Sequence, residues 1–114
     1  MQHESKKIAL IVNELVTMLL LNGNGNIEVD IKRSDEATEI AIIQRKCSYD
    51  EDFIQMLRYS LNVHRQAEVE GYYWQLVGDD DDCDELSLVG TMIDQAIVEL
   101  KDQDLWIDII RKKE

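Results

Sequence analysis

The segment IEVDIK, residues 27–32, alternates apolar and charged residues at every position. Successive side chains on a β-strand point to opposite faces, so this pattern predicts a strand with one buried and one solvated face. A second apolar run follows at 40–43, after a polar turn at 34–39. So short a connection favours antiparallel pairing. These residues therefore predict a β-hairpin that packs one face against the rest of the chain.

Helical patterns lie on both sides of this hairpin. Apolar residues recur at helical spacing between Glu4 and Leu21, which predicts a deeply buried helix. The segment NGNGN, residues 22–26, should end it, because glycine and asparagine tolerate left-handed backbone conformations. A second pattern runs from Phe53 to Val77. Gly71 leaves both one long helix and two stacked helices possible.

The C-terminal part predicts one more helix and one more strand. Apolar spacing favours a helix from Leu86 to Leu100, then a turn at 101–104 and a strand at 105–110. Helices on one face of a small antiparallel sheet give a two-layer α+β sandwich, here a single domain spanning 1–114. The residues expected to face inward are Ile27, Val29, Ile31, Ile40, Ile42, Leu105, Ile107 and Ile109.

The charge balance limits the classes of partner. The chain carries 24 acidic and 12 basic residues, for a net charge of −12, so its field repels nucleic acid and anionic membrane surfaces. We expect neither as a partner. Cys47 and Cys83 show no metal-ligand or disulfide-scaffold spacing, and no segment is typical of a signal peptide or membrane span. These features together predict a cytoplasmic protein with free thiols.

Three segments carry a resemblance to a known family. Residues 14–21, ELVTMLLL, are similar to the N box of the ATP-binding domain shared by sensor histidine kinases and anti-sigma-factor kinases. Residues 48–53, SYDEDF, stand where the first glycine box of that family falls, and residues 85–89, ELSLV, resemble the second. The resemblance covers most of the chain. It implies a histidine-kinase ATPase-like fold.

The same positions depart from what nucleotide binding needs. The resemblance implies a magnesium-holding asparagine where this chain has Met18, which has no hard oxygen to offer. Asp50 stands at the adenine-reading aspartate, but Asp52 replaces a glycine whose bare backbone lets the ligand approach. Glu85 and Ser87 replace glycines of the phosphate-binding box.

An aspartate run at 79–82 would add repulsion against a triphosphate. We therefore expect no cofactor, no metal and no catalytic residue, although Glu14 matches the family's water-activating glutamate. Residual ATP binding or kinase activity, supported by Glu14 and Asp50, is the alternative. A weaker one is calcium binding by residues 79–85, which lack the glycine and glutamate spacing of an EF-hand loop.

Two features indicate a protein interaction surface. Three aromatic residues in a row, Tyr72, Tyr73 and Trp74, cannot share one helix face, so at least one tyrosine should reach the surface. On the predicted strands, Ala41, Ile43, Trp106 and Ile110 point away from the helices. The expected partner surface comprises Tyr72, Tyr73, Ile43, Trp106 and Ile110. The sequence thus predicts a non-enzymatic regulatory module that binds a protein partner or forms a homodimer.

Overall fold

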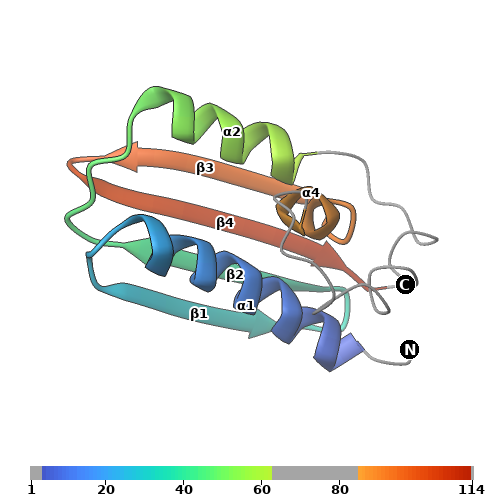
Figure 1. Ribbon diagram of the computed structural model, residues 1–114. Helices are drawn as coiled ribbons and strands as arrows, with labels where there is room; N and C mark the ends of the chain where they lie inside the picture. The colour runs from blue at the N-terminus through green and yellow to red at the C-terminus, as the bar shows by residue number, and fades with distance from the viewer. Residues whose placement is uncertain (1–3, 63–84, 114) are drawn as a thin grey trace.

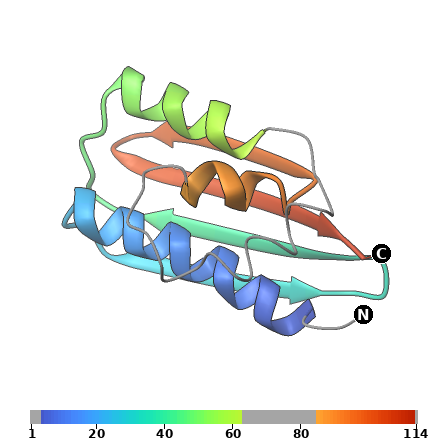
Figure 2. The same ribbon diagram turned by 45° about the vertical axis from the view of Figure 1, so that its right-hand side comes forward.

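The computed structural model describes residues 4–62 and 85–113. Its elements are α1 (Glu4–Asn22), β1 (Ile27–Arg33), β2 (Ala37–Gln44), α2 (Glu51–Leu61), α4 (Glu85–Gly90), β3 (Gln95–Lys101) and β4 (Asp104–Lys112). Both views of the ribbon show the labelled helices on one face of the sheet, with α4 between α1 and α2 (Figures 1 and 2). The predicted α+β arrangement, with helices on one face of an antiparallel sheet, is confirmed.

The sheet consists of two hairpins joined edge to edge. Its strand order is β1-β2-β4-β3, and every neighbouring pair is antiparallel. The seam between the hairpins sets Ile40 opposite Ile109 and Ile42 opposite Ile107. All of these side chains are buried, since directly opposed residues share a face and this face lies under the helices.

Helix α1 covers the sheet with a regular apolar stripe. Its buried residues are Ile8, Ile11, Leu15 and Leu19. The helix ends where Asn22 donates its side-chain N–H to the Met18 carbonyl, at 2.7 Å. A Cβ on Gly25 would lie 1.4 Å from the Arg45 carbonyl oxygen, and neither Gly23 nor Gly25 has a left-handed φ. The reason for glycine at position 25 is therefore close backbone approach, not the left-handed conformation that we expected.

The inward face of β1 is less buried than predicted. Val29 and Ile31 lie opposite Ile42 and Ile40, so they do face the helix side. Their exposed fractions are nevertheless 41% and 42%. Strand β1 is at the edge of the sheet, where none of the helices and strands in 4–62 and 85–113 completes their cover. The prediction that these side chains face inward is confirmed, but their place at the sheet edge leaves them exposed.

The predicted helix from Leu86 to Leu100 is also wrong beyond its first turns. Helix α4 ends at Gly90, and residues 95–101 form β3. In β3, Ala96 and Val98 pair with Ile109 and Ile107 on the buried face. The apolar residues fit both a helical and an alternating spacing. The segment forms a strand because pairing with β4 buries its alternate residues. The pairing also gives hydrogen-bond partners to the backbone N–H and C=O groups of the central strand β4.

The turn predicted at 101–104 is confirmed and makes this pairing possible. Its two central residues, Asp102 and Gln103, have φ of 52° and 71°. Two consecutive positive φ angles match the right-handed twist of the flanking strands in a two-residue hairpin. Lys101 and Asp104 then face each other directly, so the turn fixes the register of the whole β3–β4 hairpin.

Helix α2 settles part of the open question about the middle of the chain. Asp50 is its N-cap, and the side-chain oxygen of Asp50 accepts from the Phe53 N–H at 2.9 Å. The helix ends at Leu61 with Asn62 as its C-cap, so one unbroken helix from Phe53 to Val77 is wrong. Whether a second helix follows lies outside the described residues.

Candidate functional site

The sheet face opposite the helices carries the predicted surface residues. On the two central strands, Ile43 lies directly opposite Trp106, Ala41 opposite Asp108 and Glu39 opposite Ile110. Trp106 is 38% exposed, and Ile43 and Ile110 are half-buried. The structure thus brings together Ile43, Trp106 and Ile110 from segments more than sixty residues apart in the chain. We call this side of the sheet the outer face.

The outer face includes one apolar residue that the sequence analysis missed. Ile97 on β3 lies opposite Asp108 and is 45% exposed. Its apolar spacing predicted a helix, and under that incorrect prediction its place beside Trp106 and Ile110 does not follow. The signal that identifies it is the alternation of β3, in which Ala96 and Val98 face the core and their neighbours face out.

Tyr72 and Tyr73, the other predicted surface residues, lie outside the described residues, as do Trp74, His64, Cys83 and the aspartate run at 79–82. The structure therefore leaves the aromatic segment and the calcium alternative as predictions. Within 4–62 and 85–113, no three His, Cys, Asp or Glu side chains gather as they would around a metal ion.

Charged residues surround the apolar part of the outer face. The edge strand β1 contributes Glu28, Asp30 and Lys32, and the Lys32 ammonium lies 3.8 Å from the Asp30 carboxylate. On the opposite edge, Lys101 pairs with Glu99 at 3.1 Å. These pairs are exposed and contribute little to stability. Their charges do discourage edge-to-edge association with another sheet.

A carboxyl pair lies inside this rim. The side chains of Glu39 and Asp108 are close enough to hydrogen-bond when one of them is protonated. Burial, and then the hydrogen bond and negative charge of Glu39, raise the pKa of Asp108, with partial relief from Lys32. The Oδ1 atom of Asp108 is shielded from solvent and has no hydrogen-bond partner among the described residues. This carboxyl group is thus poorly satisfied.

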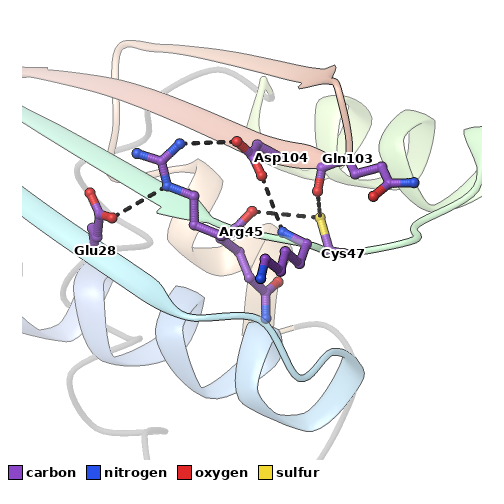
Figure 3. Close-up of polar contacts among 7 residues, drawn as sticks. Glu28, Arg45, Cys47, Gln103 and Asp104 are labelled. Carbon is purple, nitrogen blue, oxygen red and sulfur yellow. Dashed lines mark hydrogen bonds and ion pairs between the residues drawn. The ribbon is translucent and has the colours of Figure 1, made fainter.

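One end of the outer face is held by Arg45 (Figure 3). Its Nη1 donates to Oδ2 of Asp104 at 2.9 Å, and its Nε donates to Oε2 of Glu28 at 3.3 Å. The guanidinium also lies over the Trp106 ring, 5.6 Å from the centroid, which is within cation–π range. Hydrogen bonds to Glu28 and Asp104 raise the pKa of Arg45. Arg45 therefore ties β1 to β4 and restricts the Trp106 ring.

The loop beyond Arg45 is fixed to the β3–β4 turn. The Lys46 N–H donates to Oδ1 of Asp104 at 3.1 Å, and the Cys47 N–H donates to the Gln103 carbonyl at 2.7 Å. The Cys47 thiol contacts the Gln103 carbonyl at 3.4 Å (Figure 3). Burial raises the pKa of Cys47, so the thiolate is disfavoured. Cys47 is consequently a poor nucleophile and serves as a structural group.

The positions that resemble nucleotide-binding motifs have structural roles of their own. Met18 packs against the hydrophobic core. Asp50 caps α2, and Asp52 is an exposed residue in the first turn of the same helix. Glu14 is half-buried and has an interaction partner. Each of these side chains is accounted for by packing, capping or solvent.

A buried ion pair fastens the far end of β4 under the helices. Arg111 is fully buried, and its Nε and Nη2 atoms donate to the two carboxylate oxygens of Glu4, each at 2.9 Å. Its Nη1 donates to the Met92 carbonyl. This bidentate geometry satisfies the charge that burial would otherwise make costly. The pair joins the start of α1 to β4 and is structural.

Comparison with known proteins returns no similarity that assigns a family: no protein-family model and no curated protein matches this chain. Among the described helices, none has the length and apolar character needed to cross a membrane. The case for function therefore depends on the surfaces described above.

Proposed function

We propose that this chain is a non-enzymatic regulatory module that binds another protein through the outer face of its sheet. The observation that carries the proposal is the uncovered apolar centre of that face. Trp106 and Ile97 keep 38% and 45% of their surface exposed there, beside half-buried Ile43 and Ile110. Sheet faces left to solvent are normally polar on every strand, and contiguous exposed apolar residues are typical of interaction sites.

The composition of this face suits a protein partner. An exposed tryptophan held by a stacked arginine is a rigid aromatic anchor, which loses little conformational entropy on binding. Tryptophan and arginine are also the residues most often responsible for binding energy in protein interfaces. This anchor lies on β4, one of the two central strands, which is paired on both sides. A cytoplasmic location is part of the proposal.

We also propose that the domain descends from the ATP-binding domains of sensor histidine kinases and anti-sigma-factor kinases and has lost nucleotide binding. The three segments that carry the resemblance lie on α1, across the β2–α2 connection and the first turn of α2, and on α4. Helix α4 contacts both α1 and α2, so the segments share one layer. Met18 in the core and Asp50 as an N-cap support the loss of ligand-binding roles.

Photo-crosslinking in the native host tests the protein-binding proposal. A benzoylphenylalanine in place of Ile97 should capture a specific protein. The same group at Gln55, on the exposed side of α2, should not. Purified wild-type chain should compete for the captured protein, whereas an Ile43→Glu, Ile110→Glu double variant with unchanged circular dichroism should not compete. Equal competition by both would contradict the role of the outer face.

Titration with magnesium ATP tests the alternative function. The tryptophan fluorescence should show no saturable change up to millimolar nucleotide if the ligand site has been lost. Saturable binding that disappears in Asp50→Ala would instead favour a residual ATP-binding protein. Because Asp50 caps α2, the thermal midpoint of that variant must be measured alongside.

A further inference from the structure

The charges on the outer face are unevenly satisfied. Arg45 pairs with Glu28 and Asp104, Lys32 lies beside Asp30, and Lys101 lies beside Glu99. Every one of these cations thus already has an acidic neighbour. Glu39 and Asp108, in contrast, have each other, and Lys32, which lies opposite Glu39 on the neighbouring strand, relieves the repulsion only in part. The unsatisfied charge of the face is negative, and it lies among its apolar residues.

A carboxyl group in this position is costly in the isolated molecule. The Oδ1 atom of Asp108 is removed from water without receiving a hydrogen bond from any described residue. Burying an acceptor in this way has a desolvation cost that a donor from outside would recover. A guanidinium is the best-suited donor, because its parallel N–H groups can serve two carboxylates at once.

We propose that the outer face docks a basic segment of a different protein, with a cationic side chain, arginine by preference, entering between Glu39 and Asp108. Apolar residues of that segment on either side cover Ile43, Trp106 and Ile110. This inference rests on the proposed function and specifies the chemistry of its partner. The binding mode combines an apolar contact with a charge-assisted hydrogen bond at its centre.

A second copy of the chain is a poor occupant for this face. Each copy has a net charge of −12, and a two-fold dimer would place the same carboxyl pair on both sides of the interface. The cations Arg45, Lys32 and Lys101 have acidic neighbours already. Self-association would therefore bury unsatisfied carboxylates and bring two negative fields together.

The test is an NMR titration of the isotope-labelled full chain with two small probes, N-acetyl-arginine amide and its neutral isostere N-acetyl-citrulline amide. The arginine probe should shift the Trp106 indole and the amides of Ala41 and Asp108 in a saturable manner. Binding of the citrulline probe should be at least about fivefold weaker. The variant Glu39→Gln, Asp108→Asn should lose the preference for the charged probe.

A matched control removes the same kind of charge elsewhere on the face. In Glu99→Gln the carboxylate lost is one that already pairs with Lys101, so the arginine probe should bind as it does to the wild type. Three outcomes would overturn the proposal: shifts spread evenly over all acidic surfaces, an unchanged arginine preference in the double variant, or equal binding of the two probes.

The proposal and the function on which it rests can fail separately. If crosslinking through position 97 persists unchanged when Glu39 and Asp108 are neutralised, the face binds a protein but not through a cation. If sedimentation shows a wild-type dimer that Ile43→Glu breaks, the occupant is a second copy. Either result overturns the basic partner and leaves the outer face as an interaction surface.

Discussion

Asp104 and Asp108 lie on the same strand and the same face, yet their surroundings shift their pKa values in opposite directions. Asp104 accepts hydrogen bonds from the Lys46 N–H and from Arg45, and these lower its pKa. Asp108 is desolvated beside Glu39, and its pKa is raised. The end of the outer face beside the β3–β4 turn thus holds charges that have hydrogen-bonded partners. The middle of the face holds a carboxylate, that of Asp108, whose Oδ1 has none among the described residues.

The difference separates a structural region from a candidate binding region. At the Asp104 end, Arg45 pairs with Glu28 and Asp104, and the Cys47 thiol contacts the Gln103 carbonyl, so contacts link several segments of the chain (Figure 3). Such networks stabilise the fold and leave little for a ligand to add. Around Asp108, apolar exposure coincides with an orphaned carboxylate oxygen. Departures from local satisfaction of this kind are expected at functional surfaces.

Gly25→Ala should have the largest effect on stability, because it disrupts the backbone at the Asp104 end of the outer face. Its Cβ would lie 1.4 Å from the Arg45 carbonyl oxygen, so the backbone that carries Arg45 must move. We expect a loss of about 3 kcal/mol or more in the free energy of unfolding, measured by urea denaturation. Gly23→Ala is the control. Its new Cβ would meet the movable Tyr49 hydroxyl at 2.7 Å, and an equal loss in both variants would contradict this interpretation.

Arg45→Gln should have a smaller effect at the same end. It removes the ion pairs to Glu28 and Asp104 and the contact with the Trp106 ring. The unfolding midpoint should fall, and the Trp106 emission should shift as its ring becomes freer. Lys101→Gln removes one exposed ion pair and should change neither quantity measurably. If the two variants behave alike, Arg45 does not hold this end of the sheet.

Asp108→Asn should be neutral to stabilising, unlike most substitutions of a half-buried residue. The folded state raises the pKa of Asp108. The contribution of the protonated Asp108 carboxyl to the free energy of unfolding is therefore present at low pH and is lost as the pH rises through the folded pKa. At about pH 7 the variant should gain at most about 1 kcal/mol, since solvent and the nearby Lys32 screen the charge. The gain should vanish at about pH 3. A destabilised variant at neutral pH would contradict the poor satisfaction of this carboxyl.

Asp104→Asn should have the smallest effect and the opposite pH dependence. Its asparagine oxygen can still accept from the Lys46 N–H, but the charge that pairs with Arg45 is lost. The folded state lowers the pKa of Asp104. The Asp104 carboxylate therefore stabilises the fold above its unfolded pKa, and this stabilisation disappears as the pH falls through its folded pKa. Wild type and variant should therefore differ slightly at neutral pH and converge in acid. Acid unfolding curves of the two proteins measure this difference.

Much of the architecture could be predicted from local pattern. The strand at 27–32, the spacing of Ile8, Ile11 and Leu15, and the turn at 101–104 each have a short-range cause, and each appears in the structure. The burial of β1 does not alternate, because the strand lies at the sheet edge. The segment 93–100 could not be assigned correctly, because its apolar residues fit either period. Its strand conformation depends on β4, which lies further along the chain and supplies the pairing.

The candidate site was only partly predictable for the same reason. Ile43, Trp106 and Ile110 follow from alternation once strands are assigned, whereas Ile97 depends on the correct assignment of β3. The pairing of Glu39 with Asp108 requires the register between β2 and β4. No local spacing encodes that register, since it relates residues about seventy positions apart in the chain.

The amino-acid order alone determined α1, the first hairpin and the turn at 101–104, since these depend on neighbours a few residues away. The composition alone determined the negative charge. The tertiary structure decided which strands meet, and therefore which charges are satisfied. Asp104 and Asp108 look alike in the sequence. They differ because the folded chain brings Arg45 and the Lys46 N–H to the first and Glu39 to the second. Long-range contacts fix the dielectric surroundings and partners of each carboxylate, and these set its pKa and its capacity to bind.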